Sequence, residues 1–164
     1  MTTIVFSRKH GKIAADSRNT DSTGSVVLTN KIELLKDGRY FLGSGHCLTI
    51  GKAKRWAEKN FTEKSRPEFG ALFGDDKDNF AFSCLVISPD GKQAILIDDE
   101  MEPQDVLDDF LGVGTGAAYA LGALEAGATP EDALAIAIAR DGNSGGPIRV
   151  ADLRTGRCSV RGKP

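Results

Sequence analysis

The first residues of the chain, Met1-Thr2-Thr3-Ile4-Val5-Phe6, decide how the rest is interpreted. β-Branched and aromatic residues favour strands, so we expect a strand over Thr3–Phe6 that forms a hairpin with Lys12–Asp16. The hairpin ends in Ala14-Ala15-Asp16-Ser17-Arg18. If Met1 is cleaved off, Thr2 carries both a hydroxyl nucleophile and a free α-amine that can act as its base.

The composition is that of an ordinary globular protein. The 164 residues favour one domain over 1–164, with 40% apolar and 27% charged residues. The formal net charge is −2, and no basic stripe indicates nucleic acid as a partner. No apolar run reaches the roughly 18 residues that a membrane span needs, and no signal peptide is recognised. We therefore expect a cytoplasmic protein that is not bound to a membrane.

The three cysteines, Cys47, Cys84 and Cys158, have neither the number nor the spacing of a disulfide framework or a zinc site. We expect free thiols that are mostly buried, and neither a metal nor a cofactor.

Further strands are indicated by short β-branched runs that end at turn residues. Those in the first 45 residues predict an antiparallel meander, and later runs predict a second hairpin and a closing pair of strands. The expected strands are Ser25–Thr29, Ile32–Leu35, Arg39–Leu42, Phe80–Ser88, Gln93–Ile97, Pro147–Leu153 and Cys158–Arg161.

Three helices are expected between these strands. Apolar residues with a 3.6-residue period predict an amphipathic helix over about Leu48–Phe61, and the polar Thr62–Asn79 indicates a loop with at most a short helix. Small residues favour a helix within Gly112–Gly127, and a last helix begins at Thr129-Pro130 and ends near Arg140. Helices outside antiparallel sheets predict an α+β fold, a four-layer αββα sandwich of two antiparallel sheets.

One motif suggests a serine nucleophile. Asn143-Ser144-Gly145-Gly146-Pro147 resembles the nucleophile loop of chymotrypsin-like and HtrA-like proteases, Ser44-Gly45-His46-Cys47 resembles their histidine motif, and Asp98 or Asp99 lies between. However, the chain ends only 20 residues after Ser144, at Pro164, the preceding segment is alanine-rich and helical, and the length is short for two barrels. These points argue against a Ser144 nucleophile, and His46 is interpreted as structural.

A second resemblance covers nearly the whole chain, to the proteasome β-subunit and HslV group of N-terminal nucleophile (Ntn) hydrolases. Each matching segment is short, but the segments follow one another in the family's order. They are Thr2-Thr3-Ile4-Val5, Ala14-Ala15-Asp16-Ser17-Arg18, Asn30-Lys31-Ile32, Gly112-Val113-Gly114-Thr115-Gly116 and Arg140-Asp141-Gly142-Asn143-Ser144-Gly145-Gly146.

The resemblance implies a role for each candidate site residue. Thr2 would be the nucleophile, and its α-amine, with a usual pKa of about 7.7–8.0, the base. Lys31, held by Asp16, would supply a positive charge that lowers the pKa values of the Thr2 hydroxyl and amine. The amine would be oriented by Thr115, Asp141 and Ser144, and a backbone N–H near Ser44 or Gly45 would stabilise the oxyanion.

The implied function is a threonine peptidase that cleaves peptides or unfolded proteins inside a homo-oligomeric ring, with an unfoldase or cap partner left open. A small-molecule Ntn amidohydrolase and a catalytically silent assembly protein of the same fold are alternatives. The family's long second helix is missing or reduced in Thr62–Asn79, which bears on assembly. Without the resemblance, Lys31 and Asp16 would be interpreted as a surface ion pair, and Asp141 and Ser144 as turn residues.

Overall fold

Two five-stranded antiparallel sheets form the centre of the computed structural model, which describes residues 2–20, 23–67, 81–98 and 102–162. The first sheet has the order β10-β1-β2-β11-β12 and the second β5-β6-β7-β8-β9. Strands of the first sheet are β1 (Thr3–Ser7), β2 (Lys12–Ala15), β10 (Phe110–Gly114), β11 (Ile148–Asp152) and β12 (Arg157–Arg161). Those of the second are β5 (Ile32–Leu34), β6 (Tyr40–Gly45), β7 (Phe82–Ile87), β8 (Ala94–Ile97) and β9 (Gln104–Asp105).

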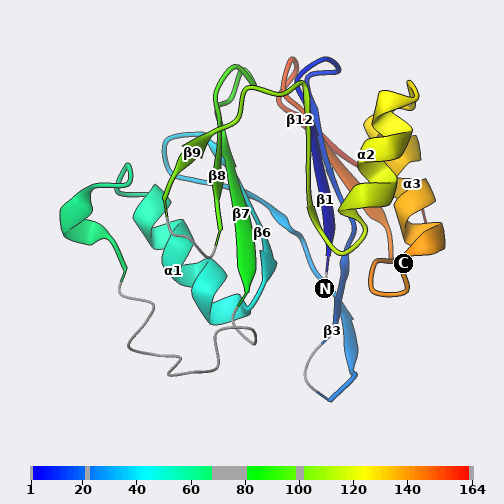
Figure 1. Cartoon of the computed structure of the whole chain (residues 1–164), viewed down its shortest axis with the longest axis horizontal. Coiled ribbons are helices and arrows are strands. Elements are labelled where there is room, and N and C mark those ends of the chain that lie inside the picture. The colour runs from blue at the N-terminus through cyan, green and yellow to red at the C-terminus, as the bar shows by residue number, and fades with distance from the viewer. Residues whose placement is uncertain (1, 21–22, 68–80, 99–101, 163–164) are drawn as a thin grey trace.

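Helices cover the outer face of each sheet (Figure 1). The second sheet is covered by α1 (Cys47–Ala57), and the first by α2 (Ala117–Glu125) and α3 (Pro130–Arg140). A short hairpin of β3 (Arg18–Thr20) and β4 (Val26–Leu28) extends from the end of the first sheet. The predicted α+β sandwich is therefore confirmed.

Alternation along the strands explains the layers. In β1, Ile4 and Phe6 belong to the core between the two sheets, whereas Val5 points to the opposite face, under α2 and α3. Successive side chains of a strand point to opposite faces, and here both faces are covered by apolar neighbours. All five residues of β1 are consequently buried.

The predicted meander is wrong in its connectivity. The hairpin β1–β2 lies in the first sheet and β5–β6 in the second, because β3 and β4 pair with each other and carry the chain across. The predictions also missed β3, β9 and β10. In β10, Gly112 and Gly114 replace the β-branched residues that would have indicated a strand.

Two helix boundaries also differ from the predictions. The first helix ends at Ala57 rather than Phe61, because Asn60 and Phe61 adopt left-handed φ angles of 54° and 55°. The Gly112–Gly127 helix begins only at Ala117, after β10. Of the predicted loop 62–79, residues 63–65 form a 3-10 turn, η1 (Glu63–Ser65), while residues 68–79, like Phe80 and Asp99, lie outside the described residues.

The prediction that the cysteines are mostly buried is wrong. All three are free thiols as expected, but only Cys84 is buried, whereas Cys47 at the start of α1 and Cys158 on the edge strand β12 are exposed. Burial raises the pKa of the Cys84 thiol far above its usual range. Within the described part of the chain, no helix is long and apolar enough to cross a membrane.

Candidate active site

Thr2 lies directly before β1, at an end of the first sheet where the backbone leaves little room. It is buried, and its carbonyl oxygen lies against Gly114, the strand partner of Thr3. A Cβ atom at Gly114 would be 1.9 Å from that oxygen, and the φ of +96° is unfavourable for any other residue. The glycine-rich segment 112–116 therefore lets β10 approach the candidate nucleophile closely.

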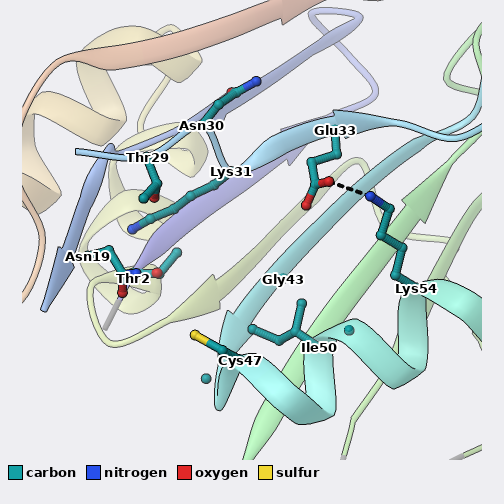
Figure 2. A pocket seen from close by; sticks show the side chains of 12 residues that line it. Thr2, Asn19, Thr29, Asn30, Lys31, Glu33, Gly43, Cys47, Ile50 and Lys54 are labelled. Carbon is teal, nitrogen blue, oxygen red and sulfur yellow. Dashed lines mark hydrogen bonds and ion pairs between the residues drawn. The ribbon is translucent and has the colours of Figure 1, made fainter. Parts of the chain in front are cut away.

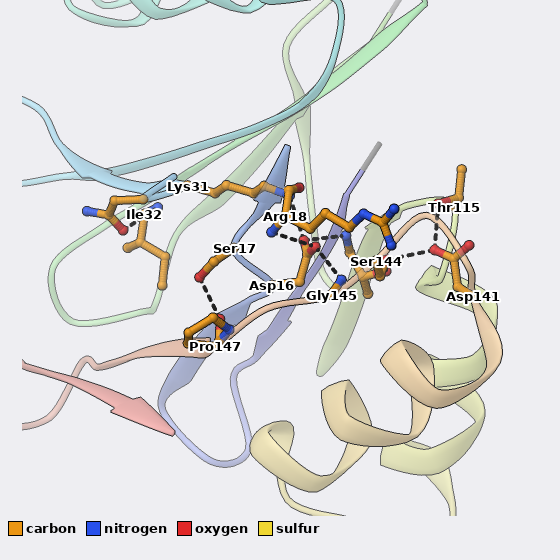
Figure 3. A network of polar contacts seen from close by, with 12 residues as sticks. Asp16, Ser17, Arg18, Lys31, Ile32, Thr115, Asp141, Ser144, Gly145 and Pro147 are labelled. Atoms are coloured by element: carbon orange, nitrogen blue, oxygen red, sulfur yellow. Dashed lines mark hydrogen bonds and ion pairs between the residues drawn. The ribbon is translucent and has the colours of Figure 1, made fainter. Parts of the chain in front are cut away.

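Asp16 is the buried centre of a polar network (Figure 3). Its Oδ1 accepts hydrogen bonds from the Thr3 N–H at 2.9 Å and from Lys31 Nζ at 2.7 Å. Its Oδ2 accepts from the Gly145 N–H at 3.0 Å and from the Arg18 N–H at 3.3 Å. One carboxylate thus joins the start of β1, the lysine and the loop after α3.

Lys31 is not a surface lysine, because only 7% of its side chain is exposed and none of its partner Asp16. Its Nζ also donates to the Arg18 carbonyl at 2.5 Å. Burial lowers the pKa of Lys31, and the charge and hydrogen bond of Asp16 oppose that shift. Figure 2 shows the amino end of Lys31 directed toward Thr2.

A second network joins Thr115, Asp141 and Ser144. Asp141 Oδ2 accepts hydrogen bonds at 2.6 Å from both Thr115 Oγ1 and Ser144 Oγ. Burial acts to raise the pKa of Asp141, but these bonds and the N–H of Asn143 outweigh it and lower the pKa below the ordinary value. The carboxylate therefore remains charged over a wide pH range.

This second network reaches the first strand through Thr3, which the sequence predictions did not include. Ser144 Oγ lies 2.6 Å from Thr3 Oγ1. Since Ser144 donates to Asp141, the Thr3 hydroxyl is left as the donor to Ser144. Strand alternation was the available signal, because it places Thr3 on the same face as Val5, toward the helices. The predicted role of Thr115, Asp141 and Ser144 in orienting the Thr2 amine stays a prediction.

The loop 141–147 is held against residues 16–18, and Arg18 is a second contributor that was missed. The N–H groups of Ser17 and Arg18 both donate to the Gly145 carbonyl, at 3.1 and 2.9 Å. Ser17 Oγ donates to the Pro147 carbonyl, and Arg18 Nη1 donates to Gly142. These contacts place Ser144 beside β1, where the resemblance required it.

The same geometry disfavours Ser144 as a nucleophile. Its side chain is buried and bonded to Asp141 and Thr3 instead of to an imidazole. His46 instead precedes α1, with its Nδ1 3.4 Å from Thr49 Oγ1. The structural interpretation of His46 agrees with this position.

A pocket of about 290 Å³ opens beside Thr2 and lies over the end of β6 and one face of α1 (Figure 2). Gly45 lines it with a φ of +113°, and a Cβ there would be 2.2 Å from the Ala81 carbonyl oxygen. Ser44, the other predicted oxyanion residue, is buried with its Oγ near Gly114. Gly45 is therefore the better placed of the two, and the oxyanion role itself stays a prediction.

Metal-ligating side chains do not gather in the described part of the chain. No group of three or more histidine, cysteine, aspartate or glutamate side chains could hold an ion there. What the site offers is a hydroxyl beside a buried ammonium, next to a pocket lined by both polar and apolar groups.

Comparison with known proteins bears on the fold. Neither a family model nor a curated protein matches the sequence. Among solved structures, the chain is similar to the crystal structure of eukaryotic HslV from Trypanosoma brucei, with a TM-score of 0.66 and 20% sequence identity. The match covers 91% of this chain and 97% of the HslV chain. At 20% identity the likeness shows the fold alone, and the predicted resemblance is confirmed for the fold: the chain has an HslV-like fold.

Proposed function

We propose that this protein is a threonine peptidase whose nucleophile is Thr2, exposed by removal of Met1. The observation that carries the proposal is the buried Lys31–Asp16 ion pair beside Thr2, at the mouth of a pocket. Burying two charges is costly unless their geometry is well satisfied. An ion pair kept at this position therefore favours a chemical role over a purely structural one.

The proposed reaction begins at the Thr2 hydroxyl. The α-amine takes the hydroxyl proton while Oγ1 attacks the substrate carbonyl carbon, and the carbonyl oxygen becomes negatively charged. When the carbonyl re-forms, the C–N bond breaks, and the ammonium proton passes to the leaving amine. A water that the amine deprotonates then attacks the resulting ester. The bond between the acyl carbon and Oγ1 breaks, the ammonium returns its proton to Oγ1, and the acid is released.

Each surrounding group has one task in this scheme. The Lys31 ammonium stabilises the developing negative charge on Oγ1 and is kept in place by Asp16. The Thr115–Asp141–Ser144 network fixes the start of β1 through Thr3. A backbone N–H at Gly45 would bind the oxyanion.

We further propose that the protein acts on peptides or unfolded proteins as a homo-oligomeric ring. The β3–β4 hairpin extends away from the sheets (Figure 1) and presents Val26, Val27 and Leu28, each 46–53% exposed. Three consecutive apolar side chains are a surface that assembly would bury. Light scattering tests this point, and a monomer that turns over small amides but no peptide would favour the amidohydrolase alternative.

The deciding experiment is a mass measurement with an active-site label. Intact mass should show the loss of Met1, and a peptide epoxyketone, which reacts with a hydroxyl and its neighbouring amine, should label Thr2. Thr2→Ala should abolish labelling and peptide cleavage, whereas Thr2→Ser should keep both. A retained Met1 together with an unlabelled Thr2 would overturn the proposal and favour a silent assembly protein.

A further inference from the structure

The end of the pocket opposite Thr2 is formed by an ion pair that the proposed reaction does not use. Lys54 on α1 donates to Glu33 Oε2 on β5 at 2.5 Å, and both residues line the pocket. The two side chains are 30% and 44% exposed, so water or a ligand can reach them. Figure 2 shows the pair across the pocket from Thr2 and Lys31.

Between the nucleophile and this pair, the pocket has an apolar floor. Ile50 lies over Gly43, because a Cβ atom at Gly43 would be only 2.4 Å from Ile50 Cγ2. A side chain that enters beside Thr2 therefore passes the Ile50 methyl groups before its end reaches Glu33 and Lys54. Such a path suits an aliphatic stem with a polar tip.

The ion pair keeps unused hydrogen-bonding capacity of both kinds. Within the described residues, Glu33 Oε1 accepts no hydrogen bond, and the Lys54 ammonium uses one of its three protons. A terminal carboxamide can donate to Glu33 and accept from Lys54 without breaking the pair. A cationic tip would instead meet the Lys54 ammonium, and an anionic tip the Glu33 carboxylate.

We propose that, in the residue whose carbonyl Thr2 attacks, Glu33 and Lys54 select an uncharged side chain that ends in an amide, above all glutamine. This inference rests on the proposed function, since it takes Thr2 as the attacking group. The selection arises because a site with paired, partly unsatisfied polar groups disfavours tips that leave them unpaired.

The test uses acetyl-Ala-Ala-X aminomethylcoumarin substrates with Gln, Arg, Glu or Leu at X. For the native protein, kcat/KM for Gln should exceed that for each of the other three at least tenfold. Lys54→Met leaves Glu33 unpaired and should raise kcat/KM for the Arg substrate relative to the Gln substrate at least tenfold. Glu33→Gln leaves Lys54 without a charged partner and should raise kcat/KM for the Glu substrate relative to the Gln substrate at least tenfold. The exchanged pair Glu33→Lys/Lys54→Glu should keep the preference for Gln.

A preference of the native protein for Arg, Glu or Leu would overturn the inference, as would a profile that none of these variants changes. Both outcomes can occur while Thr2 is labelled by the epoxyketone and peptides are cleaved. Failure of the inference is then separate from failure of the proposed function.

The thiols supply a binding measurement that needs no turnover. Cys47 is exposed and lines this pocket, whereas Cys158 is exposed on β12 outside it. In Thr2→Ala, the Gln peptide should slow alkylation of Cys47 at least fivefold and leave Cys158 unchanged, and the Arg peptide should protect neither. Equal protection by the two peptides, or none, would overturn the inference, whereas protection by the Gln peptide alone supports the selection by Glu33 and Lys54 without a measurement of turnover.

Discussion

Replacing Asp16 by asparagine tests whether the buried ion pair is as important as its geometry indicates. The substitution keeps the size of the side chain but removes its charge. Asp16 accepts hydrogen bonds with both carboxylate oxygens. Asparagine has one acceptor oxygen, so its NH₂ group would face the N–H donors that the second oxygen now binds. Lys31, with 7% of its side chain exposed, would keep its charge without its partner.

The expected loss is large. Removing one member of a buried ion pair typically costs about 3–5 kcal/mol of unfolding free energy, because the remaining charge is uncompensated. For a chain of this size, a change of that order lowers the Tm by about 6–20 °C. The neutral amide would also no longer raise the pKa of Lys31, so burial should lower that pKa further than in the native protein.

The pH dependence follows from this direction. A lysine whose folded pKa lies below its unfolded value of 10.5 costs stability while it is charged, and the cost declines as pH rises from the folded pKa toward 10.5. The deficit of Asp16→Asn should therefore be greatest near pH 7 and smaller near pH 10.

Urea unfolding at pH 7 and at pH 10 measures the loss of unfolding free energy and its pH dependence. Fluorescence can follow it, since Trp56 is the single tryptophan and is buried. The matched controls are Lys31→Met and the double variant Asp16→Asn/Lys31→Met. The double variant should be more stable than Asp16→Asn alone, because no lone charge remains buried. A loss below about 1 kcal/mol, far under the range for buried pairs, or equal deficits at pH 7 and pH 10, would refute the reasoning.

Two further substitutions probe the surroundings of Thr2. Gly114→Ala should abolish peptide cleavage, since its Cβ would overlap the Thr2 carbonyl, and should lower the unfolding free energy by about 1–3 kcal/mol through backbone strain. The control is Gly122→Ala, whose Cβ would have nothing within 4 Å. It should stabilise α2 by about 0.5–1 kcal/mol in the same urea assay. Ser144→Ala removes a hydrogen-bond donor that lowers the pKa of Asp141. The lowered pKa stabilises the fold at pH values above the ordinary pKa of 3.8, and this stability is lost as pH falls through the folded pKa. Acid unfolding of Ser144→Ala should therefore begin at a higher pH than in the native protein, and an unchanged acid midpoint would contradict the assigned hydrogen bond.

The parts of the fold that could be predicted from sequence are those with local physical causes. The last helix is an example. Thr129 caps it by accepting the Asp132 N–H at 3.2 Å, and Pro130 occupies its first turn, as the sequence indicated. The hairpin β1–β2 likewise follows from its β-branched residues and the turn between the strands.

Elements set by distant partners were not accessible in this way. Strand β10 forms because its glycines fit against β1, more than 100 residues earlier in the sequence. The crossing from the first sheet to the second depends on β3–β4 pairing, for which residues 18–28 carry only a weak pattern. The exposure of Cys47 and Cys158 reflects their positions at a helix start and on an edge strand, not their residue type.

The same division applies to the site. The resemblance identified Asp16, Lys31, Thr115, Asp141 and Ser144, which the structure brings into two hydrogen-bonded networks around the start of β1. It did not identify the Thr3 hydroxyl or Arg18, whose roles depend on loop 141–147 packing against β1 and β3. Nor does sequence spacing predict that Lys54 meets Glu33, because that contact requires α1 to lie over β5 in one register.

The position of Thr2 between the two sheets separates activation from selection. Asp16 and the Asp141 network act on the first sheet, where β1 is held between β2 and β10. Glu33, Ile50 and Lys54 belong to the second sheet and its helix. Within the described residues, the side chains of Glu33 and Lys54 bond to each other and to neither network, so substitutions at Glu33 or Lys54 should change which peptide is cleaved without changing the rate at which Thr2 is labelled by a small epoxide. A parallel fall in labelling and selectivity would show that the pocket also positions the nucleophile.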